Sequence, residues 1–82
     1  MPQNATIGIY YFDVFNNPRP VQNPIELKGV TMLGAKRKVS AISKDIGLLT
    51  HTRQWINRSP LYAIRYFRCK DTNATRLIVI EF

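Results

Sequence analysis

Reactive side chains are scarce in this 82-residue sequence, which has one cysteine, Cys69, and one histidine, His51. A lone cysteine can form no internal disulfide, which suits a reducing compartment. A nucleophilic cysteine needs a histidine in contact and a third group to orient it, and no motif brings these two residues together. Neither a metal-ligand spacing nor a glycine-rich phosphate loop occurs. We therefore expect no enzyme, no metal and no cofactor, with a thiol or hydrolytic enzyme using Cys69 and His51 as an alternative.

Long apolar runs are missing as well. Asp13 interrupts the apolar stretch near the N-terminus, and no run approaches the roughly 20 residues of a membrane span. We expect neither a secretory signal nor a membrane partner. The length fits one domain, residues 1–82, in which the prolines of residues 16–24 indicate an exposed loop with polyproline character.

Negative charge is the third shortage. Twelve lysines and arginines face five carboxylates, which gives a formal net charge of +7. The positive side chains of a small domain with such an excess repel one another, so we expect a partner that carries negative charge. A role in keeping a small protein soluble is the alternative.

The arrangement of the expected elements indicates an α+β fold. Residues 6–15 and 75–82 are rich in β-branched and aromatic residues, as is typical of strands. Three prolines within residues 18–24 exclude a helix or a central strand there. The expected elements are strands at 6–15, 25–28, 48–58, 61–70 and 75–82, a helix at 32–45 and a turn at 71–74. Their order, β-β-α-β-β-β, predicts an antiparallel sheet of four to five strands with one α-helix packed on one face.

The helix prediction depends on local signals at both ends. Thr31 is a good N-cap, and Gly47 stands where a glycine commonly ends a helix. Gly34 weakens the first turn by about 1 kcal/mol relative to alanine, and a close contact with the sheet would explain it. One apolar stripe is expected to face the sheet: Met32, Ala35, Val39, Ile42 and Ile46.

A single helix leaves the second face of the sheet open. The run LIVI at residues 77–80 is apolar in both strand registers, which usually indicates cover on both sides. The open face must then carry exposed aromatic residues, meet a second copy of the chain, or bind a partner.

Basic residues gather in two places. On the helix, Arg37 and Lys44 point away from the apolar stripe, and Lys36 and Lys38 flank it. A solvated helix surface usually mixes both signs, so this excess indicates a contact surface, although a charge run is often only a solvated surface.

The second set lies on the last hairpin, where basic and aromatic residues alternate. Such alternation can stack bases and hold phosphates. Two registers remain open: Tyr62, Ile64 and Tyr66 face the helix, or Ala63, Phe67 and Cys69 do, with Arg65 as the misfit. The members of this second set are Arg65, Arg68, Lys70, Arg76, Tyr62 and Tyr66.

The segment IELKGVTMLGAKRKVSAIS, residues 25–43, resembles small phage-encoded proteins of the type I-F anti-CRISPR group. The likeness is carried by Thr31, by Ala35, Lys36 and Arg37, and by the strands after Gly47. The resemblance implies a basic, non-enzymatic protein that binds a CRISPR ribonucleoprotein and blocks access of nucleic acid. It also implies that lysines and arginines of the helix and sheet make the contacts. The proline-rich loop and the long first strand depart from that group.

These observations lead to one main hypothesis and two alternatives. We expect a phage or mobile-element protein that binds a host ribonucleoprotein in the cytoplasm of the cell that carries it, as an anti-CRISPR inhibitor. A regulator that binds DNA or RNA directly is the second possibility. The third is a structural or assembly protein that forms a homodimer through the open sheet face.

Overall fold

The computed structural model describes residues 3–50 and 54–82, in which seven strands form one sheet and one helix packs against it. The strands are β1 (Gln3–Phe12), β2 (Pro18–Pro20), β3 (Ile25–Val30), β4 (Leu48–Thr50), β5 (Ile56–Ser59), β6 (Tyr62–Cys69) and β7 (Thr75–Glu81), and the helix is α1 (Met32–Asp45). The predicted α+β class and the single helix on an antiparallel sheet are confirmed.

The three long strands form the centre of the sheet in the order β1-β7-β6. On the outer edge of β1, β3 pairs with its first half and β2 with its second half. On the outer edge of β6, β5 pairs with its first half and β4 with its second half. All these pairings are antiparallel.

The strand count exceeds the predicted four to five for two reasons. Residues 18–20, expected in a loop, form an edge strand, where a proline needs to donate no ladder hydrogen bond. Residues 48–58, expected as one strand, are divided into β4 and β5, which pair with opposite ends of β6. The first strand also starts earlier than predicted, at Gln3, and ends at Phe12.

Helix α1 begins and ends at the predicted residues. The Thr31 hydroxyl accepts a hydrogen bond from the Gly34 N–H at 3.1 Å, which satisfies one of the free donors of the first turn. Gly47 follows the helix with φ at +72°, a conformation that favours glycine. Gly34 lies beside the end of β3, but an added Cβ would meet Val30 Cβ at 4.0 Å and Thr31 Oγ1 at 3.4 Å, which are ordinary contact distances, so this contact with the sheet does not require a glycine.

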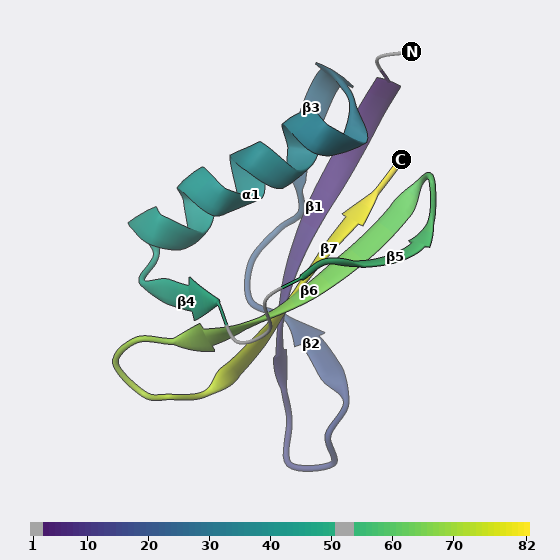
Figure 1. The fold of residues 1–82 in the computed structure, drawn as a ribbon. Coiled ribbons are helices and arrows are strands. Elements are labelled where there is room, and N and C mark those ends of the chain that lie inside the picture. The colour runs from purple at the N-terminus through teal and green to yellow at the C-terminus, as the bar shows by residue number, and fades with distance from the viewer. Residues whose placement is uncertain (1–2, 51–53) are drawn as a thin grey trace.

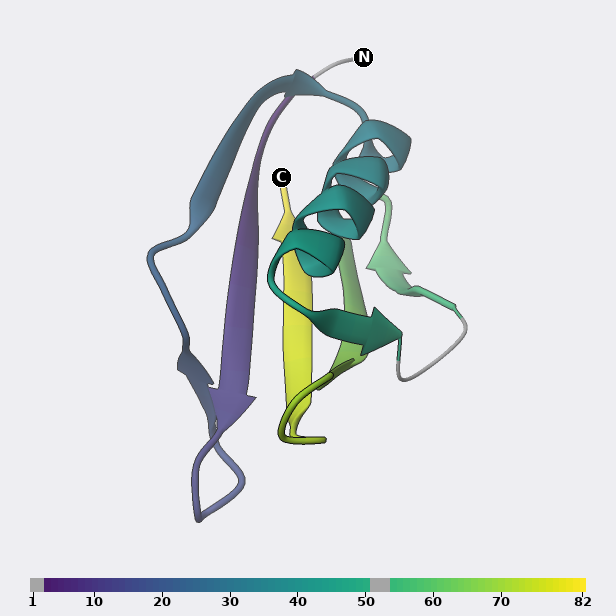
Figure 2. The ribbon, with the colours of Figure 1, turned by 90° about the vertical axis from the view of Figure 1, so that its left-hand side faces the viewer.

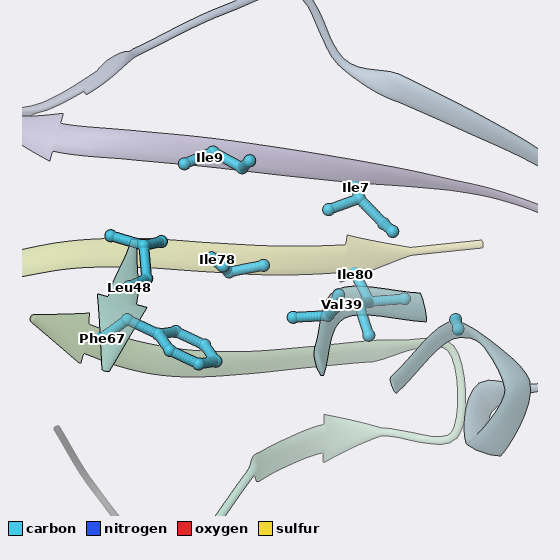
Figure 3. Packing of buried hydrophobic residues seen from close by; sticks show 8 residues of the cluster. Ile7, Ile9, Val39, Leu48, Phe67, Ile78 and Ile80 are labelled. Carbon is cyan, nitrogen blue, oxygen red and sulfur yellow. The ribbon is translucent and has the colours of Figure 1, made fainter. Parts of the chain in front are cut away.

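The core lies between α1 and one face of the sheet (Figure 3). Ala35 and Val39 of the predicted stripe are fully buried there, whereas Ile46 at its end is 46% exposed. They pack on side chains that alternate along the central strands, namely Ile7, Ile9, Phe67, Ile78 and Ile80, together with Leu48. Ser43 is the buried polar residue among those described, and its hydroxyl donates to the Ser40 carbonyl at 3.0 Å.

Helix α1 crosses only one side of the sheet, and within residues 3–50 and 54–82 no other element covers the opposite side (Figures 1 and 2). The β1–β2 hairpin projects beyond the body of the molecule, at the end away from α1 (Figure 1). In the described part of the chain, no helix has the length and apolar character needed to span a membrane.

Candidate binding surfaces

The outer side of α1 carries exposed cations. Arg37, Lys38 and Lys44 are all exposed, and the first turn of the helix contains no acidic residue. Arg37 and Lys44 are seven residues apart, so they lie on the same side of the helix about 10 Å from each other along its axis. Within the described residues, none of the three forms a salt bridge with a carboxylate. We call Arg37, Lys38 and Lys44 the helix cation surface.

The fourth predicted helix cation, Lys36, contacts other residues of the fold. Its Nζ lies 2.7 Å from Asn57 Oδ1 and 5.7 Å from the centroid of the Trp55 ring. Arg65 approaches the same ring at 5.9 Å and the Phe67 ring at 5.6 Å. Lys36 and Arg65 therefore join α1 and β6 around Trp55, and cation–π attraction holds this edge of the fold together.

The other basic residues of the last hairpin are separated from one another. Arg76 is on the helix side of the sheet and donates from Nη1 to the Thr75 carbonyl at 3.1 Å. Arg68 lies on the opposite face, and Lys70 is exposed just beyond β6. The hairpin therefore does not bring Arg65, Arg68 and Arg76 to one surface.

The tyrosines of this set lie on the uncovered face. Ala63 and Phe67 are buried toward the helix, so Tyr62 and Tyr66 point to the other side. The register in which Arg65 is the misfit is confirmed, and the register that places Tyr62, Ile64 and Tyr66 on the helix side is wrong. The side chains that share this open face are Thr6, Gly8, Tyr10 and Phe12 of β1, Thr75, Leu77, Val79 and Glu81 of β7, and Tyr62, Ile64, Tyr66 and Arg68 of β6.

Aromatic rings cover the middle of the open face. The Phe12 and Tyr66 rings are stacked, with centroids 6.4 Å apart and 23° between their planes. The Tyr10 ring lies over Gly8, where an added Cβ would come within 2.8 Å of it. Beneath such rings Ile64 and Val79 are only 7% and 6% exposed. The face therefore presents half-buried aromatic residues, and Arg68 is its one cation on the three central strands.

Sequence reasoning missed the tip of the β1–β2 hairpin. Residues 13–15 were expected to continue the first strand, but they form a turn in which Val14 and Phe15 are 93% and 82% exposed. Asp13 Oδ1 accepts hydrogen bonds from the N–H groups of Phe15 and Asn17, both at 2.9 Å. An Asp two residues before a turn donor is a known local signal for such a loop. The tip is therefore preorganised, with two apolar side chains in solvent.

Charge at this tip is balanced locally. Asp13 Oδ2 lies 2.9 Å from Arg19 Nε, the ion pair found within the described residues. Hydrogen bonds from the Asn17 backbone and then from the Arg19 side chain hold the pKa of Asp13 below its ordinary value.

Of the two residues considered for catalysis, the structure describes Cys69. A hydrogen bond from the Thr72 side chain, followed by backbone hydrogen bonds of Thr72 and Asp71, lowers the pKa of the Cys69 thiol. The alternative of a Cys69–His51 pair concerns a histidine that lies outside the described residues. In residues 3–50 and 54–82 there is no group of three or more His, Cys, Asp or Glu side chains that could hold a metal ion.

Comparisons with known proteins found no matching family model, no matching curated protein and no matching solved structure.

Proposed function

We propose that this protein is a non-enzymatic binding protein whose helix cation surface contacts the phosphates of a nucleic acid, either free or held in a ribonucleoprotein. The observation that carries the proposal is that Arg37, Lys38 and Lys44 are exposed without a carboxylate partner among the described residues. Exposed, uncompensated cations attract phosphates and release the counterions that surround them.

The proposal places the contact on the helix rather than on the open sheet face. A stacking platform for bases needs aromatic rings beside cations that hold the phosphates. The open face has the rings, but Arg68 is its one cation on β1, β7 and β6, and Glu81 shares the face. The helix carries Arg37, Lys38 and Lys44 against one exposed carboxylate, Asp45, and keeps a positive excess, so phosphate contacts there are favoured.

The anti-CRISPR hypothesis stays a prediction and names the first ribonucleoprotein to test. In this version the protein occupies a surface that normally meets nucleic acid, or the guide backbone itself, and thereby blocks target binding. The resemblance of residues 25–43 is the argument for that partner, and the exposed positions of Arg37 and Lys38 agree with the contacts that it implies.

The test uses fluorescence anisotropy with labelled duplex DNA, single-stranded DNA and RNA, together with pull-down of purified type I-F CRISPR ribonucleoprotein. Three phosphate contacts predict that affinity for duplex DNA falls roughly 40-fold between 50 and 200 mM salt. The double variant R37E/K44E should abolish binding to whichever partner is found. The control K28E/R58E makes the same change of net charge at exposed residues of β3 and β5 and should retain binding.

Two results would overturn the proposal. One is the absence of binding to all four partners at low salt. The other is equal loss of affinity in R37E/K44E and K28E/R58E, because net charge rather than the helix cation surface would then explain the attraction. Binding to the ribonucleoprotein without binding to any free nucleic acid would support the anti-CRISPR version.

A further inference from the structure

The central strands of the open face carry a carboxylate, Glu81, at one end and a guanidinium, Arg68, at the other. At one end Glu81 lies between Thr6 and Tyr62, and Glu26 of β3 is paired with Thr6 on the other side. Lys28 lies beyond Glu26, and Arg58 of β5 precedes Ser59, the partner of Tyr62, so the edges of this end add two cations and one carboxylate to Glu81 of the central strand β7. At the other end Arg68 is paired with Thr75, and the turn beyond it adds Lys70 and Asp71, which leaves this end net positive.

We propose that the open face is the interface of a homodimer, in which two copies pack sheet against sheet around a two-fold axis that runs across the strands. Such an axis reverses the strand direction of the second copy. The Arg68 end of one copy then lies over the Glu81 end of the other, twice in each dimer. An axis along the strands would instead place Arg68 over the Arg68 of the other copy and Glu81 over its Glu81. Repulsion between these like charges favours the antiparallel arrangement.

Side-chain size differs between neighbouring rows of the open face. One row across the central strands is Gly8, Val79 and Ile64, and the next is Tyr10, Leu77 and Tyr66. The Tyr10 ring already covers Gly8, so reversing the second copy sets the row of large side chains of one sheet against this aromatic cover of the other. Face-to-face sheets pack about 10 Å apart.

The dimer should be weak. The three central strands and their edge partners give a face of roughly 20 by 20 Å, smaller than the ~800 Å² per partner of a standard interface. We therefore expect the dimer to form only at high protein concentration. The dimer does not depend on the proposed function, because α1 lies on the far side of each sheet and both helix cation surfaces stay exposed.

Sedimentation velocity from 10 μM to 1 mM tests the proposal with a pair of charge reversals. R68E and E81R each place like charges at both contacts of the dimer, so each variant alone should be monomeric where the wild type is dimeric. An equimolar mixture of R68E and E81R should dimerise again, because one contact regains an opposite pair with reversed signs and the other keeps the natural pair. K38E, on the helix cation surface, should dimerise as the wild type does.

The proposal is overturned by a wild type that stays monomeric at 1 mM, by single variants that dimerise normally, or by a mixture that does not recover. Circular dichroism of each variant shows that loss of the dimer is not loss of the fold. A monomeric wild type in which added single-stranded DNA quenches the tyrosine fluorescence and protects Tyr62 and Tyr66 from nitration would assign the open face to nucleic acid instead.

Discussion

The guanidinium of Arg19 donates from Nε to Asp13 Oδ2 at 2.9 Å, and this ion pair joins the end of β1 to β2 below the hairpin tip. The other oxygen of the same carboxylate accepts the N–H groups of Phe15 and Asn17. One aspartate thus fixes the conformation in which Val14 and Phe15 are held in solvent, and it does so most strongly while it is ionised, because the ion pair with Arg19 needs the carboxylate.

The hairpin should therefore lose support in acid. Because the pKa of Asp13 in the folded protein is lowered from its ordinary value of 3.8, the carboxylate favours the folded state at every pH above that value. The contribution is lost as the pH falls through the folded pKa. Urea unfolding from pH 7 to pH 2 should show D13N less stable than the wild type at neutral pH and equal to it at the acid end. D71N changes an exposed aspartate outside this network and is the control; a constant gap between D13N and wild type across the pH series would contradict the prediction.

The cluster around Trp55 should contribute measurably to stability. Replacing Lys36 by methionine keeps the apolar stem but removes the hydrogen bond to Asn57 and the cation above the ring. We expect K36M to lower the free energy of unfolding by about 1 kcal/mol. K38M, at an exposed position, should leave it within ~0.5 kcal/mol. Fluorescence of Trp55, the single tryptophan, follows both unfolding transitions.

Replacing Gly34, in the first turn of α1, and Gly47, just after α1, by alanine should change the free energy of unfolding in opposite directions. G34A adds a Cβ that meets Thr31 Oγ1 at 3.4 Å and Val30 Cβ at 4.0 Å, so it fits without a clash and the gain in helix propensity should stabilise the protein by about 1 kcal/mol. G47A forces an alanine into the left-handed region at φ +72° and should destabilise it by about 1 kcal/mol. Thermal unfolding separates the two variants, and a loss of stability in G34A would show that the first turn has no room for a methyl group.

Because the Tyr10 ring contacts Gly8, the effects of mutations at these two residues on stability should not be additive. A Cβ at Gly8 would lie 2.8 Å from the Tyr10 ring, so G8A must displace the ring and should cost about 1–2 kcal/mol. Y10L removes the ring atoms that clash, so G8A should cost less in that background. A double-mutant cycle measures the difference, and additive effects would mean that the ring does not rest on Gly8.

The helix could be predicted from sequence because its signals are local. Thr31 and Gly47 define its ends through contacts within a few residues, and the spacing of Ala35 and Val39 defines its buried side. The sheet was harder. Pro18–Pro20 becomes a strand only because β1 lies beside it, and no local signal in the prolines reveals that pairing.

The helix cation surface could be predicted for the same reason as the helix, because its positions follow from local helical geometry. Arg37 and Lys44 were expected on the outer side of the helix, where the structure has them, since helical geometry alone decides it. The position of Arg65 could not be decided from the strand alone, because either register buried a plausible set of apolar residues. In the structure Trp55, ten residues earlier in the chain, gives Arg65 an aromatic partner on the helix side, and strand periodicity alone does not reveal that contact.

The pairing of β1 with β7 has a consequence for biosynthesis. The middle ladder of the sheet joins the first strand to the last. Residues 75–81 must therefore leave the ribosome before that ladder can form, and until then Ile7 and Ile9 lack their strand partners Ile80 and Ile78. Nascent chains should accordingly stay open to proteases and chaperones until residues 75–81 have emerged, and then fold in one late step.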